Sequence, residues 1–210
     1  MYKTTISLHD CNGQRKYLNQ SERIRFFEVT KRRNTCTKLF CQLLYYTGAR
    51  IAEIHNLTTT SIDIANGTVI LETLKKRQRG IFREIPLPDH LLKDLDVYIG
   101  KLEFTNEETQ PLWQFSLRTA SRYIKAVMKE ANITGTKGCA RGLRHGFAVN
   151  AVDKAPITLV KKWLGHAALE TTEIYLNVIG EEEREIAQRV WLSTKERTVQ
   201  MPCAYTQIHT

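Results

Sequence analysis

Three basic side chains lie close together in one short stretch of the sequence. Arg141, Arg144 and His145 are spaced i, i+3 and i+4, so a helix would place all three on one face. Cations stacked in this way repel one another and destabilise a protein that has nothing bound to it. The cluster makes physical sense when an anion lies against it. The spacing therefore predicts an anion-binding face on this helix.

Two further patterns carry residues that could take part in chemistry. Arg50 stands three residues before Glu53 in TGARIAE, and LGHAALETTEIY contains His166 and ends at Tyr175. An arginine and a glutamate three apart on a helix are most often a solvated ion pair. A histidine after a glycine is usually structural, and a tyrosine on a helix usually belongs to the core or to an interface. Each pattern is weak when it is taken alone.

A run of cations marks a predicted turn. Two β-rich stretches, 68–74 and 81–85, flank the basic run KKRQRG at 75–80, which indicates a hairpin with a positively charged tip. Such a tip is most often simply solvated. It could equally contact phosphates, or place one lysine as a proton donor.

The elements that must position these residues are mostly helical. One apolar stripe at helical spacing predicts a helix that ends at Gly48, and its members are Cys36, Leu39, Phe40, Leu43 and Leu44. A new helix begins at Arg50, so this arginine stands at a junction of two helices. Asn19 or Ser21 caps an earlier helix through about 29, with Ile24, Phe26 and Phe27 facing the core. Further helices are expected at 91–100, 116–131, 142–152, 157–164, 170–178 and 181–191.

The sum is an α+β fold, mainly helical, with a small antiparallel β-sheet. Residues 1–16 are polar and irregular and are expected to form a flexible N-terminal arm. Residues 17–192 form one domain, and 193–210 form a C-terminal tail without a strong period.

Composition narrows the class of protein. The 210 residues carry 31 Lys and Arg against 22 Asp and Glu, a net charge of +9, which favours a polyanionic partner such as nucleic acid. No apolar stretch is long enough to span a bilayer, and the first residues lack the apolar region of a signal peptide. The five cysteines are scattered, which disfavours a disulfide scaffold and a zinc site. These features predict a cytoplasmic protein without a membrane partner.

Taken together, the patterns resemble the catalytic domain of the tyrosine recombinases, the phage integrase family. That family carries an arginine in a TGxRxxE setting, a lysine in a β-hairpin, an HxLRH box, an LGH box and a tyrosine nine residues beyond the last histidine. Here Tyr175 follows His166 by nine residues, and the likeness runs from about Tyr17 to Trp191. Several dispersed positions in the right order are hard to produce by chance.

The resemblance implies cleavage and rejoining of DNA through a covalent 3′-phosphotyrosine at Tyr175, without metal or nucleotide cofactor. Arg50 and Arg144 would clamp the phosphate oxygens, because guanidinium groups are permanently charged and bind in a bidentate way. His166 would add a hydrogen bond to the same oxygens. A hairpin lysine would protonate the leaving 5′-oxygen, with Lys75 as the first choice and Lys76 as its rival. Glu53 would orient a cation, and His145 would buttress the helix.

The chain departs from the family in two places. Arg141 stands where the HxLRH box begins with a histidine, usually treated as the general base toward the tyrosine, and an arginine cannot accept a proton at physiological pH. Either Arg141 activates Tyr175 electrostatically and binds phosphate, or His145 or water takes the proton. Residues 1–16 also cannot supply the N-terminal DNA-clamping domain of most members. The chain is therefore a natural single-domain recombinase, a remnant or a truncated protein.

The partner implied is duplex DNA with inverted-repeat half-sites, bound by a tetramer in the nucleoid and assisted by DNA-bending accessory proteins. Without a clamp, the grip on DNA would rest on the catalytic domain. The expected phosphate contacts are Lys76, Arg77, Arg79, Arg118, Arg122, Lys125, Lys161 and Lys162. A DNA-binding regulator with the same fold and little catalysis is the alternative, and a basic helical protein unrelated to DNA is a third.

Overall fold

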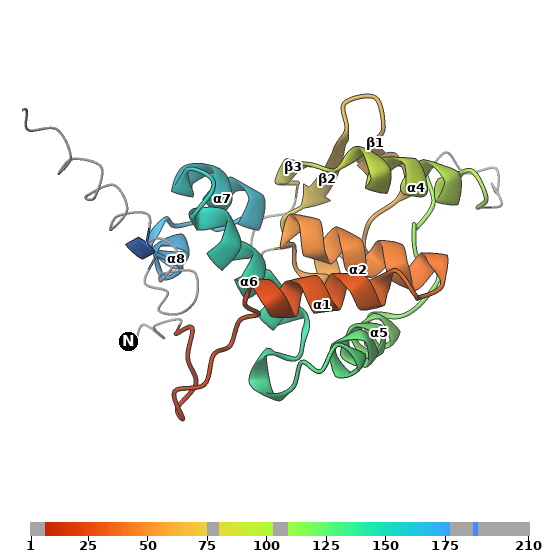
Figure 1. Ribbon diagram of the computed structural model, residues 1–210. Coiled ribbons are helices and arrows are strands. Elements are labelled where there is room, and N and C mark those ends of the chain that lie inside the picture. Colours follow the sequence, from red (N-terminus) through yellow and green to blue (C-terminus); the bar gives the residue numbers. More distant parts are fainter. Residues whose placement is uncertain (1–6, 75–79, 103–108, 177–186, 189–210) are drawn as a thin grey trace, which may run out of the picture. The chain divides into compact units, whose positions relative to one another are not determined.

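The computed structural model describes residues 7–74, 80–102, 109–176 and 187–188. The chain divides into two units, Met1–Asn177 and Val178–Thr210, and all elements named here lie in the first (Figure 1). The helices are α1 (Gln20–Thr30), α2 (Thr35–Thr47), α3 (Ile51–His55), α4 (Asp89–Ile99), α5 (Leu117–Glu130), α6 (Ala140–Val152), α7 (Ile157–Leu164) and α8 (Glu170–Glu173). The strands are β1 (Ile62–Asp63), β2 (Thr68–Glu72) and β3 (Phe82–Pro86), and two 3-10 turns are η1 (Thr59–Ser61) and η2 (Gly135–Lys137).

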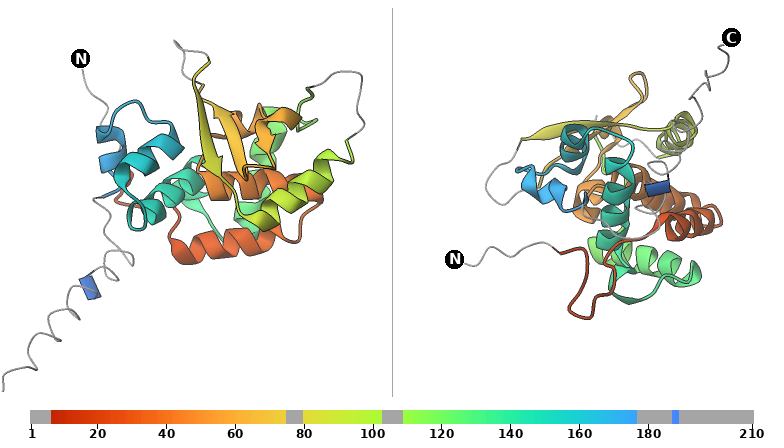
Figure 2. Two further views of the ribbon diagram at one scale, coloured as in Figure 1. Left: turned by 90° about the horizontal axis from the view of Figure 1, so that it is seen from above. Right: turned by 60° about the vertical axis from the view of Figure 1, so that its left-hand side comes forward.

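Helix α2 carries the centre of the core. It contacts α1, α3, α4 and α6, and its side chains Leu39, Phe40 and Leu43 are fully buried. The sheet and α4 lie on one side of α2, and α5 lies on the other (Figures 1 and 2). The apolar stripe predicted from the sequence is therefore the stripe that packs.

Helix α1 begins with a capping box. The Asn19 side chain accepts a hydrogen bond from the backbone N–H of Glu22 at 2.9 Å, and the Glu22 carboxylate accepts one from the backbone N–H of Asn19 at 3.0 Å. The expectation that Ile24 faces the core is wrong, because 49% of this residue is exposed. The side of α1 that packs inward carries Phe26, as predicted, together with Arg23, and Ile24 points away from that side.

The three strands form an antiparallel sheet in the order β1-β2-β3. Val69 pairs with Ile85, and Leu71 pairs with Arg83. All four side chains face the core. Arg83 is therefore a buried arginine at a strand position where the alternation of the strand predicts an apolar side chain. The predicted hairpin is confirmed, while its basic tip at 75–79 lies outside the described residues.

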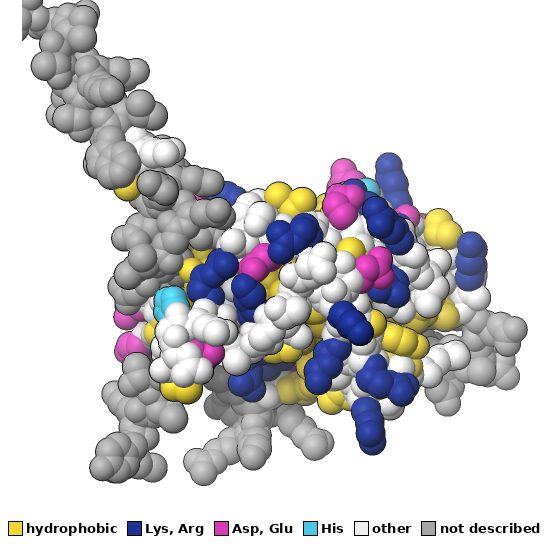
Figure 3. Space-filling model, turned by 60° about the horizontal axis from the view of Figure 1, so that its bottom comes forward, with side chains coloured by type: hydrophobic (Ala, Val, Ile, Leu, Met, Phe, Trp, Pro, Cys, Tyr) yellow, Lys and Arg dark blue, Asp and Glu magenta, His cyan; other side chains and the backbone are white. Residues whose placement is uncertain are grey.

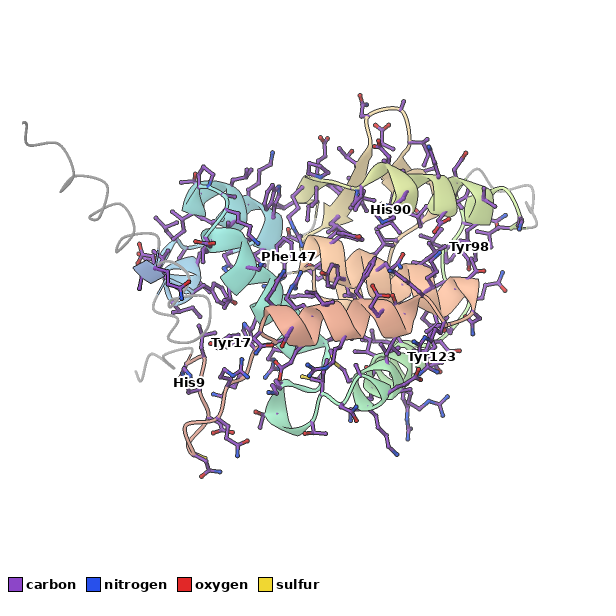
Figure 4. All side chains as sticks on the ribbon, viewed as in Figure 1. His9, Tyr17, His90, Tyr98, Tyr123 and Phe147 are labelled. Atoms are coloured by element: carbon purple, nitrogen blue, oxygen red, sulfur yellow. The ribbon has the colours of Figure 1, made fainter. Side chains whose placement is uncertain are left out.

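The segment before α1 is folded against α6. Tyr17 and Leu18 are fully buried, and the backbone N–H of Leu18 donates to the carbonyl of Gly142 at 3.2 Å. Within 7–16 the chain makes a turn, closed by a bond from the N–H of Lys16 to the carbonyl of Leu8 at 2.8 Å. Figure 4 shows His9 of this turn beside Tyr17.

Of the last two helices described, one has its predicted length and the other is shorter than predicted. Helix α7 begins after Pro156 as expected, but α8 covers only Glu170–Glu173 and continues as turns through Leu176. The helix expected at 181–191 falls almost entirely outside the described residues. In the part of the chain that is described, no helix has the length and apolar character that crossing a membrane requires.

Candidate active site

Arg50 is presented by a tight junction between α2 and α3. Helix α2 ends at Gly48, whose φ of 61° is left-handed, and α3 begins at Ile51. A Cβ on Gly48 would lie 2.2 Å from the ring of Phe147, so only glycine lets α6 approach this turn (Figure 4). Arg50 follows as the N-cap of α3, with 38% of its side chain exposed. The junction predicted from the sequence is confirmed.

The buried carboxylate of Glu53 binds two arginines, Arg50 and Arg83. Its carboxylate accepts from Nη1 of Arg50 at 2.8 Å, from the backbone N–H of Arg50 at 2.9 Å and from Nη2 of Arg83 at 2.6 Å. Burial alone would raise the pKa of Glu53, but Arg83 and then Arg50 outweigh it and hold this pKa below its ordinary range. The carboxylate is therefore ionised and fixes the Arg50 guanidinium.

Arg83 is a part of the site that the sequence patterns missed. Its Nε donates to the carbonyl of Trp163 at 2.8 Å, and its Nη1 donates to Oγ1 of Thr73 at 3.0 Å. Together with Glu53, these contacts link the base of the β2–β3 hairpin to α3 and to the end of α7. The sequence did contain a signal for this role, namely a charged residue at a core-facing strand position. A buried arginine requires a buried acceptor, so such a residue indicates a partner in the core.

Arg144 ties together the ends of two helices. Its Nη1 donates to the carbonyl of Gly48 at 2.9 Å and its Nη2 to the carbonyl of Leu164 at 2.8 Å, which close α2 and α7. Helix C-terminal carbonyls carry partial negative charge and suit a buried cation. Burial, followed by the nearby Arg50, lowers the pKa of Arg144 to about 10, so the group is still charged at neutral pH.

His166 is placed by the left-handed C-cap of α7. Gly165 has a φ of 64°, and the backbone N–H of His166 donates to the carbonyl of Lys161 at 3.2 Å. The His166 Nδ1 lies 3.0 Å from Oγ1 of Thr172, a second partner that the sequence patterns did not reveal. Burial and the neighbouring arginines, first Arg144, lower the pKa of His166 to about 3, so its ring is neutral in the free protein.

Tyr175 is buried and bound to a histidine. Its hydroxyl lies 2.7 Å from Nδ1 of His145, and its ring lies nearly parallel to that of His166, with 6.3 Å between centroids. Only 2% of Tyr175 is exposed. Burial raises the pKa of the phenol to about 12, although Arg144 and Arg50 pull it down. Burial also lowers the pKa of His145 to about 4, helped by Arg144, Arg141 and Lys16.

One cavity of about 530 Å³ collects the predicted catalytic side chains. Those that line it are Arg50, Arg141, Arg144, His166 and Tyr175, and His145, predicted as a supporting residue, lines it as well. None of the described lining residues is acidic. The side chain of Arg141 is exposed and makes no hydrogen bond or ion pair with a described residue. The cavity thus combines three guanidinium groups with a phenol, which suits an anion with a reactive centre. Lys75 and Lys76 lie outside the described residues.

The other predicted DNA contacts lie on two surfaces. Arg118, Arg122 and Lys125 are exposed along α5. Figure 3 looks toward the side where α5 lies, on which most of the charged side chains are Lys and Arg. Lys161 and Lys162 line a second cavity of about 610 Å³ between β3 and α7, which shares His166 with the first. Arg77 and Arg79 lie outside the described residues. Among the described residues, no group of three or more His, Cys, Asp or Glu could hold a metal ion.

The family model described as the phage integrase family matches residues 16–182. The chain belongs to the phage integrase family. A tyrosine recombinase named XerA from Pyrococcus furiosus is 29% identical over 181 residues, which are 83% of this chain and 61% of the relative. The chain spans between 49% and 61% of the length of three curated relatives that it matches.

Solved structures of recombinases share the fold. The crystal structure of a XerA recombinase superposes with a TM-score of 0.71 at 24% identity, covering 83% of this chain and 64% of that one. A XerH site-specific recombinase in a post-cleavage complex with palindromic difH substrate gives 0.70 at 21% identity, covering 91% and 58%. The predicted fold class, mainly helical with a small antiparallel sheet, is confirmed.

Proposed function

We propose that this chain carries out the strand cleavage and rejoining of a site-specific DNA recombinase, with Tyr175 as the nucleophile. The observation that carries the proposal is the cavity in which the Tyr175 hydroxyl shares one space with Arg50, Arg141 and Arg144. A buried phenol surrounded by guanidinium groups suits attack on a phosphodiester. A protein that only binds DNA has no need to bury a phenol among these cations.

The arginines act on the charge that the reaction builds. Attack on phosphorus increases the negative charge on the two non-bridging oxygens, and donors positioned beforehand stabilise it most strongly. Arg50 is fixed by Glu53, and Arg144 is fixed by two helix-end carbonyls, so neither has to reorganise. His166, held by Thr172, donates a further hydrogen bond to the same oxygens.

The leaving 5′-oxygen requires a proton. The family resemblance assigns this task to the hairpin lysine, Lys75, with Lys76 as its rival. The Arg83 contacts to Thr73, Trp163 and Glu53 support this, because they fix the base of the hairpin against the site. The tyrosyl phosphodiester conserves the energy of the broken bond, so rejoining requires no nucleotide cofactor.

The substrate is duplex DNA with inverted-repeat half-sites. The net charge of +9 and the exposed cations of α5 and α7 support phosphate contacts outside the cavity. The XerH relative was solved with a palindromic substrate, which supports the inverted repeat. By the same resemblance, the active form is a tetramer on two sites, assisted by DNA-bending proteins, and it works in the cytoplasm at the nucleoid.

A covalent adduct tests the proposal. The wild type and Tyr175→Phe are expressed in cells that carry the native flanking DNA, the lysates are denatured, and DNA attached to the protein is sequenced. Tyr46→Phe is the matched control, since Tyr46 also pairs with a histidine, His90 at 3.1 Å, but lies outside the cavity. Attached DNA is expected with the wild type and with Tyr46→Phe, and none with Tyr175→Phe.

The attached reads would also locate the target site. If the wild type yields no adduct but binds DNA in a salt-sensitive way, the chain is a DNA-binding regulator with this fold. If the wild type shows neither an adduct nor salt-sensitive DNA binding, the chain is neither a recombinase nor a DNA-binding regulator.

A further inference from the structure

We infer that His145 is the general base that takes the proton from Tyr175, in place of the histidine that the family carries where this chain has Arg141. The inference rests on the proposed function. It concerns a proton that must leave the phenol before or during attack on phosphorus. The guanidinium of Arg141 cannot accept that proton.

The geometry places His145 on the reacting atom. Its Nδ1 lies 2.7 Å from the Tyr175 hydroxyl, well within the reach required of a general base, and the ring centroids are 5.7 Å apart. A buried hydroxyl needs an acceptor for its proton, and this is the one hydrogen bond that it makes within the described residues. His166, the other imidazole in the cavity, lies with its ring beside that of Tyr175 and uses its Nδ1 on Thr172.

The surroundings keep His145 in the form that accepts a proton. Burial and the cations Arg144, Arg141 and Lys16 lower its pKa to about 4, so the ring is neutral at physiological pH. When it takes the proton it becomes a cation among cations. The negative charge that grows on the phosphate at the same moment compensates for this, so proton transfer and attack are coupled. The groups that face the His145–Tyr175 pair are Arg50, Arg141, Arg144, Lys16 and His166.

The step balances without an added reagent. The O–H bond of Tyr175 breaks and its proton goes to Nδ1 of His145. The bond from the phenolic oxygen to phosphorus forms, and the bond from phosphorus to the 5′-oxygen breaks. The 5′-oxygen leaves with a proton from the general acid. In the rejoining step the 5′-hydroxyl attacks phosphorus and gives its proton back to the group that acted as general acid. The bond from phosphorus to the phenolic oxygen breaks, and His145 returns its proton to Tyr175.

Single-turnover cleavage tests this assignment on the DNA recovered with the wild-type adduct. The substrate carries a 5′-bridging sulfur at the scissile phosphate, since a thiolate leaves without a proton and the measured rate then reports on the nucleophile. His145→Gln retains a hydrogen-bond acceptor but cannot take up a proton, and His145→Ala opens space for added imidazole. His90→Ala is the matched control, because it removes the imidazole of the His90–Tyr46 pair outside the cavity.

His145→Gln and His145→Ala are each expected to cleave about 100-fold more slowly or worse, as for the loss of a general base, with DNA affinity retained. Imidazole should restore much of the rate to His145→Ala and none to His145→Gln. The wild-type rate should rise with pH and level off as His145 loses its proton in the complex, and this rise should be absent from His145→Gln.

Cleavage by His145→Gln within about threefold of the wild type would overturn the inference, since hydrogen bonding alone would then suffice; general bases contribute far more than that. The inference would also be overturned if His145→Ala is folded and binds DNA but added imidazole does not raise its cleavage rate. These results differ from a failure of the proposed function, in which the wild type itself forms no adduct and His90→Ala behaves identically.

Discussion

The guanidinium carbon of Arg83 lies 3.1 Å from the point where a Cβ atom on Gly165 would stand. The residue that places His166 is therefore packed directly on the residue that connects the hairpin to Glu53. Because the backbone of Gly165 is also left-handed, with a φ of 64°, a side chain here would meet two separate obstacles.

Substitutions at Gly165 and at Gly13 distinguish backbone strain from the close approach of Arg83. Gly13 has a similar φ of 73°, but a Cβ there would meet nothing within 4 Å. Gly13→Ala should cost only the backbone strain, about 1–2 kcal/mol, whereas Gly165→Ala should cost more and should also slow strand cleavage. Urea denaturation and the adduct assay measure the two effects. Equal losses of stability in the two variants would contradict the close approach of Arg83.

Removing Arg83 should leave a buried carboxylate with too few partners. Arg83→Leu is expected to lower the free energy of unfolding by about 3–5 kcal/mol, because Glu53 is fully buried and loses its second arginine. Adding Glu53→Leu should recover part of that loss, which a double-mutant cycle would reveal. Arg33→Leu, which breaks the half-exposed Arg33–Glu130 pair, should cost no more than about 1 kcal/mol. Similar losses of unfolding free energy in Arg83→Leu and Arg33→Leu would contradict the prediction that the buried pair matters more than the half-exposed one.

Arg144 should not tolerate lysine. A single ammonium group cannot contact the carbonyls of Gly48 and Leu164 and a phosphate at once. Arg144→Lys is expected to slow cleavage by about 100-fold or more and to lower the unfolding free energy by about 1–3 kcal/mol. Arg25→Lys is the control, since Arg25 also bonds a helix-end carbonyl, that of Ala131 at 3.0 Å, but lies outside the cavity. Cleavage by Arg144→Lys at the rate of Arg25→Lys would be the contrary result.

The neutral histidines should make stability depend on pH. The folded pKa of His166 is about 3 against an ordinary 6.5, so the unfolded chain binds more protons between these values. Stability is therefore fully present above pH 6.5 and is lost as pH falls toward the folded pKa. His166→Gln should reduce the slope of unfolding free energy against pH between 7 and 5, a window chosen to avoid most carboxylate titration. An unchanged slope would show that the ring is not shielded from protons.

The exposed cations of α5 should contribute to DNA binding through phosphates. Arg122→Ala is expected to weaken binding across sequences and to reduce the slope of log K against log salt by about 1. Lys93→Ala removes an exposed cation from α4 and should leave the slope as it is. Gel-shift titrations over a series of salt concentrations measure both variants. An equal change in slope would mean that α5 has no special role.

The sequence predicts best those features that depend on residues close together in the chain. The stripe on α2, the Asn19 cap, the junction before Arg50 and the β2–β3 hairpin follow from local spacing, and the structure confirms each. Spacing also indicated that Arg141, Arg144 and His145 share one stretch of helix. The six predicted residues that line the cavity belong to patterns that are weak alone and specific only when they occur together in order.

Contacts between elements were beyond the reach of periodicity. Arg83 occupies an ordinary core-facing strand position, and only the approach of α3 and α7 shows why a charge is buried there. The bond between His145 and Tyr175 depends on how α6 meets the turn after α8. Ile24 was misplaced for a related reason, since the side of α1 that packs is set by its neighbours.

The residues that line the cavity come from widely separated parts of the sequence, from Ala49 to Tyr175. Contacts between residues so far apart form late in folding, because long loops must close before such contacts can stabilise anything. A nascent chain reaches Tyr175 only after the arginines that surround it have been made, and domains fold as units. A half-made protein would thus display basic surfaces that attract DNA while having no competent nucleophile. Cutting becomes possible only after folding has brought these distant segments of the domain together.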